Sequence, residues 1–221
     1  MTNDTISDLL NINIHKRKKL LENLSRKGIS QTTLEAMNKI PREYFLNPNL
    51  YDVAYEDQAL PIGNMQTISQ PLTVGLMTDL LDVNIGHKVF EIGTGSGYQA
   101  LILNQLGAEV YTIERIPELY SKAINTFKEF GVTINCSLGD GTLGYPGYSQ
   151  FARIIVTAGA PFIPEELKFQ LSIGGIMVIP VGDKKGQVMT RVVRTNETEY
   201  VITEHDNYRF VPLIGKAGWD E

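Results

Sequence analysis

The stretch FEIGTGSGYQ, residues 90–99, decides the fold of this chain. An apolar run enters three closely spaced glycines, Gly93, Gly95 and Gly97, and a segment with helical character follows them. Glycine permits tight turns and lets a ligand approach the main chain closely. A glycine-rich loop between a strand and a helix is typical of nucleotide-binding α/β proteins, so this loop predicts a ligand as well as a fold.

Strand-like and helix-like segments alternate around this loop. Strands are predicted at KVFEIG (88–93), EVYTIE (109–114), TINCSLGD (133–140), ARIIVTAG (152–159) and GIMVIPVG (175–182). Helices are predicted from Pro71 onward and at 98–107, 117–131 and 164–171. Such alternation indicates a parallel sheet covered by helices on both faces.

The last part of the chain has a different pattern. Residues 186–196 and 199–215 are two β-rich runs with no helix between them, which predicts an antiparallel pair. We therefore expect five parallel strands with an antiparallel C-terminal end, in one domain spanning 1–221. Its expected parts are an N-terminal helical cover (1–40), an irregular active-site segment (41–70), a cofactor-binding α/β core (71–183) and a β-rich C-terminal part (184–221).

The first 70 residues divide into a helical and an irregular segment. Residues 7–40 predict two helices, with Gly28 ending the first and Ser30 capping the second. Residues 41–70 contain several turn signals and little periodicity. Long irregular segments in compact domains are often functional, so 41–70 is expected to contribute to a site.

Composition excludes several classes of protein. The 221 residues are 43% hydrophobic and 20% charged, with a formal net charge of −5. The basic run HKRKK at 15–19 fits a solvated helix face, so we expect no nucleic-acid or membrane role. Cys136 is the only cysteine, which rules out an intrachain disulfide. No run of about 18 apolar residues and no basic start with a cleavage signal is present, so we expect a cytoplasmic protein.

The glycine loop lacks the residues that bind a diphosphate. A dinucleotide fingerprint needs its third glycine where Tyr98 stands, and a Walker loop needs lysine followed by serine or threonine where Tyr98 and Gln99 stand. The remaining interpretation is a nucleoside ligand without a diphosphate, whose amino-acid part lies over the glycines.

Acidic residues at neighbouring strand ends support this interpretation. Glu114 follows Gly93 by about 21 positions, the spacing of a carboxylate that binds ribose hydroxyls. Asp140, followed by Gly141, is placed to accept from the adenine amine, and Glu91 precedes the loop as a further candidate. Taken singly, the glycines fit a plain turn, Glu114 a helix entry and Asp140 a turn former. Their order and spacing together favour S-adenosylmethionine.

Five motifs then carry a family resemblance. They are YEDQALPIGNMQTISQP (55–71), FEIGTGSGYQ (90–99), GDGTLGYP (139–146), IIVTAGAPFIP (154–164) and RFVPL (209–213). In this order they closely resemble protein-L-isoaspartate O-methyltransferases. The resemblance implies a Rossmann-like, seven-stranded methyltransferase fold. It also implies methyl transfer from S-adenosylmethionine to the free α-carboxyl of L-isoaspartyl residues, so the expected partners are damaged proteins and peptides, with no obligate protein partner.

The resemblance also assigns roles to residues around the start of the helix predicted from Pro71. Ser69 matches the family's active-site serine, and Gln70 and Thr73 match residues that line the cofactor. From the residues alone, the alternative for Ser69 is a place at the helix cap, because Pro71 suits the first helical position.

The acceptor peptide is expected to lie beside two other segments. The family uses the regions of TAGAP (157–161) and RFVPL around the peptide, which implies Thr157, Ala158 and Val211, with Ile68 beside Ser69. The alternative for these residues is ordinary packing at strand ends.

The chemistry needs neither a metal nor a general base. A carboxylate with a reference pKa near 4 is already ionised at pH 7. The three histidines, His15, His87 and His205, have no metal-like spacing. Two alternatives remain open: a methyltransferase for a small-molecule carboxylate or amine, and a non-catalytic S-adenosylmethionine-binding protein.

Overall fold

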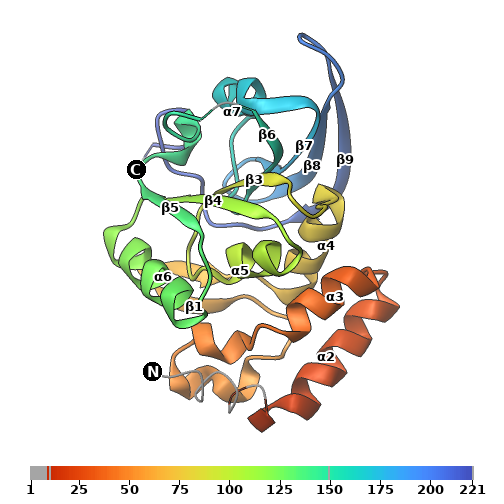
Figure 1. Cartoon of the computed structure of the whole chain (residues 1–221), viewed down its shortest axis with the longest axis vertical. Helices are drawn as coiled ribbons and strands as arrows, with labels where there is room; N and C mark the ends of the chain where they lie inside the picture. Colours follow the sequence, from red (N-terminus) through yellow and green to blue (C-terminus); the bar gives the residue numbers. More distant parts are fainter. Residues whose placement is uncertain (1–8, 10, 149, 221) are drawn as a thin grey trace.

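The computed structural model describes residues 9, 11–148 and 150–220. At its centre lies a seven-stranded sheet in the order β5-β4-β3-β6-β7-β8-β9 (Figure 1). Its strands are β3 (Lys88–Ile92), β4 (Glu109–Glu114), β5 (Asn135–Leu138), β6 (Phe151–Val156), β7 (Leu171–Gly182), β8 (Gln187–Arg194) and β9 (Tyr200–Tyr208).

Strand directions confirm the predicted α/β architecture. Strands β5, β4, β3, β6 and β7 pair in parallel, and β8 and β9 add an antiparallel end. The strand order reverses beside β3, which lies between β4 and β6. Ligands of open α/β sheets bind beyond the carboxyl ends of the strands at such a reversal.

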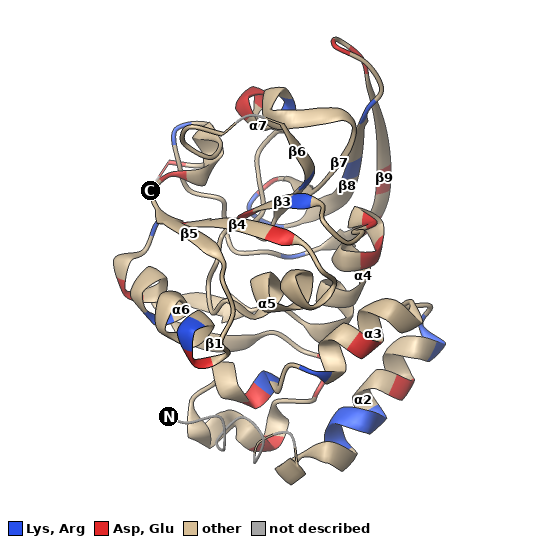
Figure 2. Cartoon of the chain, in the orientation of Figure 1, with Lys and Arg blue, Asp and Glu red and all other residues tan. Residues whose placement is uncertain are grey.

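Helices cover both faces of the sheet. They are α2 (Ile14–Arg26), α3 (Gln31–Asn38), α4 (Pro71–Leu81), α5 (Tyr98–Gln105), α6 (Pro117–Glu129) and α7 (Glu165–Gln170), with short 3-10 turns η1 (Arg42–Phe45), η2 (Pro48–Val53) and η3 (Gly141–Leu143). Figure 2 shows that α2 carries the basic run near the N-terminus. The lysines of that run are exposed, whereas Arg17 is buried.

Local signals set the ends of the first helices as expected. Gly28 has a φ of 93° and follows α2, and the Ser30 hydroxyl accepts a hydrogen bond from the Thr33 backbone N–H at the start of α3. Residues 7, 8 and 10 of the predicted helical range lie outside the described residues.

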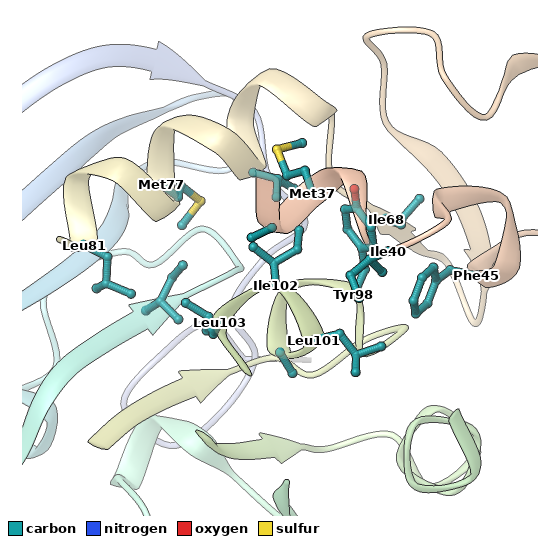
Figure 3. Close-up of a cluster of buried hydrophobic side chains, with 14 of the residues drawn as sticks. Met37, Ile40, Phe45, Ile68, Met77, Leu81, Tyr98, Leu101, Ile102 and Leu103 are labelled. Atoms are coloured by element: carbon teal, nitrogen blue, oxygen red, sulfur yellow. The ribbon is translucent and has the colours of Figure 1, made fainter. Parts of the chain in front are cut away.

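The larger core lies between the sheet and the N-terminal helices. Figure 3 shows side chains of α3, α4 and α5 meeting there, among them Met37, Met77 and Ile102, each at most 2% exposed. A second core, on the other face of the sheet, includes Phe90 and Leu167. Helix α5 starts at the glycine loop, and the burial of its residues 98–103 fixes the position of that loop.

One prediction for 41–70 was wrong in part, because the segment contains a β-hairpin. Strands β1 (Leu60–Gly63) and β2 (Gln66–Ile68) pair antiparallel. They are too short for a period-2 pattern to identify them, and Pro61 weakens the first. Ile62 packs over the glycine loop, with its Cδ1 3.6 Å from where a Cβ on Gly95 would lie.

The hairpin tip contains a residue in a strained conformation. Asn64 and Met65 both have positive φ, 49° and 56°, which is the geometry of a two-residue turn that favours Asn-Gly. The Met65 side chain is 97% exposed and packs on nothing that would compensate.

We expect Met65→Gly to stabilise the protein by about 1 kcal/mol, because glycine adopts left-handed backbone geometry without a steric penalty. Urea denaturation measures the change in the free energy of unfolding. The matched control is Lys39→Gly, at an exposed residue with a φ of −80°. That variant should gain no stability, and an equal gain in both would remove the conformational explanation.

Candidate functional site

A first cavity opens at the carboxyl ends of β3, β4 and β6, where the strand order reverses. The hairpin covers one side of it and the C-terminal segment 211–214 another. Its lining residues are Gln66, Thr67, Ile92, Gly93, Gly95, Ile113, Glu114, Arg115, Ile116, Gly139, Gly141, Thr157, Ala158, Val211, Pro212, Leu213 and Ile214.

A second cavity lies between the start of α4 and the C-terminal strands. Its lining residues are Ala59, Thr67, Ser69, Gln70, Thr73, Thr157, Lys185, Gly186, Asn207, Tyr208, Arg209, Phe210 and Val211. A smaller third cavity, between the glycine loop and the start of α4, is lined by Ser69, Gly93, Gly95 and their neighbours. Thr67 and Thr157 line all three cavities, so the cavities meet at these two side chains.

Thr157 fixes the shape of this junction. Its hydroxyl lies 2.9 Å from the carbonyl oxygen of Ile92 and 2.7 Å from that of Gly93. A Cβ on Gly93 would lie 2.5 Å from the same hydroxyl oxygen, and the φ of Gly93 is +92°. Only glycine therefore fits at position 93, and the first turn of the loop is held against β6.

Glu114 joins the glycine loop to the end of β4. The residue is 5% exposed, and its carboxylate accepts from the backbone N–H of Gly95 at 2.8 Å and of Ile116 at 2.9 Å. Each carboxylate oxygen has two acceptor lone pairs, so both can accept a further hydrogen bond from the cavity. The predicted ribose contact fits this geometry.

Asp140 is oriented differently from the expectation. Its Oδ1 accepts from the backbone N–H and the hydroxyl of Thr142, and its Oδ2 accepts from the backbone N–H of Lys216 at 2.8 Å. Burial alone would raise the pKa of Asp140, but these hydrogen bonds lower it. Gly139 and Gly141 line the first cavity, whereas the Asp140 side chain is turned toward the C-terminal segment. Asp140 therefore positions the cavity wall, and its contact with an adenine stays a prediction.

At two of the predicted cofactor positions, the packing of neighbouring side chains leaves room only for glycine. A Cβ on Gly97 would lie 2.8 Å from a ring carbon of Phe127 in α6, and a Cβ on Gly141 would lie 2.5 Å from Ile113. Gly97 lines none of the three cavities, so its role is to bring α5 close to α6.

Glu91, a predicted cofactor residue, is fully buried and lines none of the three cavities. Its Oε2 accepts from the hydroxyl of Thr112 at 2.6 Å, and its Oε1 has no hydrogen-bond partner. Burial raises the pKa of Glu91 to about 8. Burial likewise raises the pKa of the neighbouring Cys136 thiol to about 12, which keeps that thiol protonated.

Residues 68–73 divide between the second cavity and the hydrophobic core, a division that the sequence did not predict. Ser69, Gln70 and Thr73 all line the second cavity, and none of them lines the first. Gln70 is the cap residue of α4 and makes no side-chain cap bond, whereas the Asp57 carboxylate accepts from the backbone N–H of Leu72 at 2.9 Å, so Ser69 is not a capping residue. Ile68 is 4% exposed and belongs to the core; among the three cavities it lines only the smallest (Figure 3).

The predicted residues Thr157 and Val211 line both main cavities, and Ala158 lines the first. Sequence reasoning missed Thr67, because it missed the hairpin. It also missed Arg115 and Ile116, although their position directly after Glu114 is where a base above the ribose would pack.

The cavities fit a nucleoside that carries an amino-acid group. The Glu114 carboxylate with its unused lone pairs suits vicinal hydroxyls. Apolar side chains of Ile113 and Ile116 border the space where a base would lie, and the glycine loop borders the third cavity. These features match S-adenosylmethionine and provide no cation for a diphosphate within the loop.

Comparisons with known proteins agree with this description. The family model described as protein-L-isoaspartate(D-aspartate) O-methyltransferase matches residues 15–218. The chain is 49% identical over 200 residues to the protein-L-isoaspartate O-methyltransferase of Flavobacterium johnsoniae, covering 90% of this chain and 93% of that protein. It is 50% identical over 200 residues to the Flavobacterium psychrophilum protein of the same name, with the same coverage.

Solved structures show the same fold. A structure named protein-L-isoaspartate O-methyltransferase matches with a TM-score of 0.81 and 28% identity, covering 91% of this chain and 67% of that chain. A Plasmodium falciparum structure, described as a protein-L-isoaspartate O-methyltransferase in complex with S-adenosyl-L-homocysteine, matches with a TM-score of 0.78 and 24% identity, covering 90% and 98%.

The buried Glu91 predicts a pH dependence of stability. Between the ordinary pKa of a glutamate and about 8, the unfolded chain releases a proton that the folded protein retains, so stability falls as pH rises through this window. Glu91→Gln removes this titration. Its stability relative to the wild type should therefore rise from pH 5 to pH 8, by at most about 1.4 kcal/mol per pH unit.

Denaturation of both proteins at several pH values measures this difference. Glu118→Gln, at an exposed residue of α6, is the control and should keep the wild-type pH dependence. Parallel curves for Glu91→Gln and the wild type would contradict a neutral buried carboxyl.

Proposed function

The chain belongs to the protein-L-isoaspartate O-methyltransferase family, and from this premise we propose how its two main cavities divide the reaction. The enzyme transfers a methyl group from S-adenosylmethionine to the free α-carboxyl of L-isoaspartyl residues in damaged proteins. The first cavity holds the cofactor and the second holds the isoaspartyl residue. The observation that supports this division is the junction, where Thr67 and Thr157 line both cavities.

The residues that hold the cofactor come from the ends of β3 and β4. Glu114 accepts from the ribose hydroxyls, and Gly93 and Gly95 give the amino-acid part access to the main chain. When bound, S-adenosylmethionine supplies a methyl group on a positively charged sulfur. Gln70 and Thr73, which the family resemblance assigns to the cofactor, line the second cavity and neither of the other two, so we assign them to the acceptor side.

Ser69 orients the acceptor in this proposal. The acceptor carboxylate is ionised at neutral pH, so no residue has to remove a proton from it. The Ser69 hydroxyl donates a hydrogen bond that holds one carboxylate oxygen while the other faces the methyl group. The smallest cavity, which includes Ser69, has no charged residue in its lining. This absence favours transfer, because a cation there would stabilise the anionic nucleophile more than the transition state.

The peptide backbone lies along the C-terminal segment. Val211 is held in place because its carbonyl accepts from the Gly159 N–H at 2.8 Å, and Phe210 donates its N–H to Gln187 at 2.8 Å. A rigid extended segment suits an acceptor that occurs in many different sequences, since it can be read through main-chain hydrogen bonds. Val211, with Thr157 and Ala158, supplies this edge.

We place the reaction in the cytoplasm, where S-adenosylmethionine is made, and propose that no nucleic acid, membrane or obligate protein partner takes part. Among residues 9, 11–148 and 150–220, no helix is long and apolar enough to cross a membrane. We also propose that the whole chain acts as a single domain, with residues 41–70 shaping the site.

The direct test offers labelled S-adenosylmethionine with an isoaspartyl peptide and with its normal aspartyl twin. Base-labile label should appear on the isoaspartyl peptide alone. Label on both peptides, or on small carboxylic acids instead, would contradict the assignment of the acceptor.

Ser69→Ala should lower kcat/KM for the isoaspartyl peptide by about 10–100-fold, because it removes a hydrogen bond to a charged group. The affinity for S-adenosylmethionine, measured by calorimetry, should change little. Ser25→Ala, at an exposed residue of α2, is the control. Equal losses of transfer and of cofactor affinity would make Ser69 a structural residue.

Glu114→Ala should have the opposite effect. The KM for S-adenosylmethionine should rise by about 10–100-fold, since the charged acceptor of the ribose hydroxyls is lost, and the KM for the peptide should stay close to the wild-type value. Circular dichroism of the variant checks that the strand ends remain folded. Unchanged cofactor affinity in a folded variant would remove Glu114 from the cofactor site.

A further inference from the structure

The second cavity has an unusual charge for this chain. Its lining contains two basic residues, Lys185 and Arg209, and no acidic residue. The chain as a whole carries a formal net charge of −5. Lys185 lies in the turn between β7 and β8, and Arg209 directly follows β9, so two separate segments bring positive charge to one cavity.

Both side chains are available to a ligand. Lys185 and Arg209 are exposed, and within the described part of the chain neither of their side chains makes an ion pair or a hydrogen bond. Asp183, the acidic residue of the same turn, accepts from the backbone N–H groups of Lys185 and Gly186 at 2.7 and 3.0 Å. Its carboxylate is therefore bound to the turn itself and is not part of the cavity lining.

The two cations lie away from the reacting carboxylate. They do not line the smallest cavity, which includes Ser69 and the glycine loop and whose lining is uncharged. The isoaspartyl carboxylate at Ser69 would thus be held by neutral groups, while neighbouring side chains of the same peptide would reach Lys185 and Arg209.

We propose that Lys185 and Arg209 select isoaspartyl peptides that carry an aspartate or glutamate within two residues of the damaged position. The proposal rests on the assignment of the second cavity to the acceptor. Each exposed ion pair contributes up to about a fivefold change in affinity, and both weaken as salt is added. The selection therefore acts on the KM for the peptide, whereas kcat and the KM for S-adenosylmethionine do not depend on it.

The test uses three isoaspartyl peptides that differ only in one neighbour of the isoaspartyl residue, which is glutamate, glutamine or lysine. One set places this neighbour two positions before the damaged residue and a second set two positions after it. The wild type should bind the glutamate peptide of at least one set best and the lysine peptide worst, with about a fivefold difference in KM between glutamate and glutamine at low salt.

The double variant K185Q/R209Q should lose this discrimination and bind the three peptides alike. The matched control is K184Q, which makes the same charge change one position away. Lys184 does not line the cavity, and its ammonium lies 5.3 Å from the ring centroid of Trp219. K184Q should keep the wild-type order of KM values.

Three results would overturn the proposal: no discrimination by the wild type in either set, discrimination that survives in K185Q/R209Q, or an equal rise in KM for all three peptides. The last result would mean that the cations attract any carboxylate. The proposed function is tested separately, because the glutamine peptide and its normal aspartyl twin show whether isoaspartyl residues are methylated at all.

Discussion

The site depends on one carboxylate that joins two loops. Glu114, at the end of β4, accepts from the N–H of Gly95 in the glycine loop and from that of Ile116 after its own strand. The two loops extend from neighbouring parallel strands, and this one acceptor satisfies a backbone N–H group in each of them. The same carboxylate lines the first cavity, so one side chain both joins the two loops and faces the proposed cofactor site.

Segments distant in sequence close the site from two sides. The hairpin of β1 and β2 brings Ile62 over the glycine loop and Thr67 to the junction. The C-terminal segment is fastened by Asp140 through the N–H of Lys216, and by the indole N–H of Trp219, which donates to the Gly159 carbonyl at 3.0 Å. The strands of the sheet provide the floor of the site, and these two segments provide its walls.

Much of this arrangement could be predicted from sequence, because it depends on local signals. The alternation of strands and helices, the end of α2 at Gly28 and the cap at Ser30 follow from residues close to one another. The orientation of Asp140 could not, because its partner Lys216 is 76 positions away. The family resemblance supplied candidates such as Ser69 and Gln70, but only the structure separates the residues of the two main cavities.

The position of Asp140 has a consequence for the ageing of the enzyme itself. The sequence contains one Asp–Gly dipeptide, 140–141, and no Asn–Gly, the pairs most prone to close into a succinimide. Closure needs a protonated carboxyl that turns onto the following nitrogen. Here hydrogen bonds lower the pKa of Asp140 and hold both of its oxygens, and Gly141 is buried between Ile92 and Ile113. The protein is thereby protected at its most vulnerable peptide bond against the same lesion that it recognises in others.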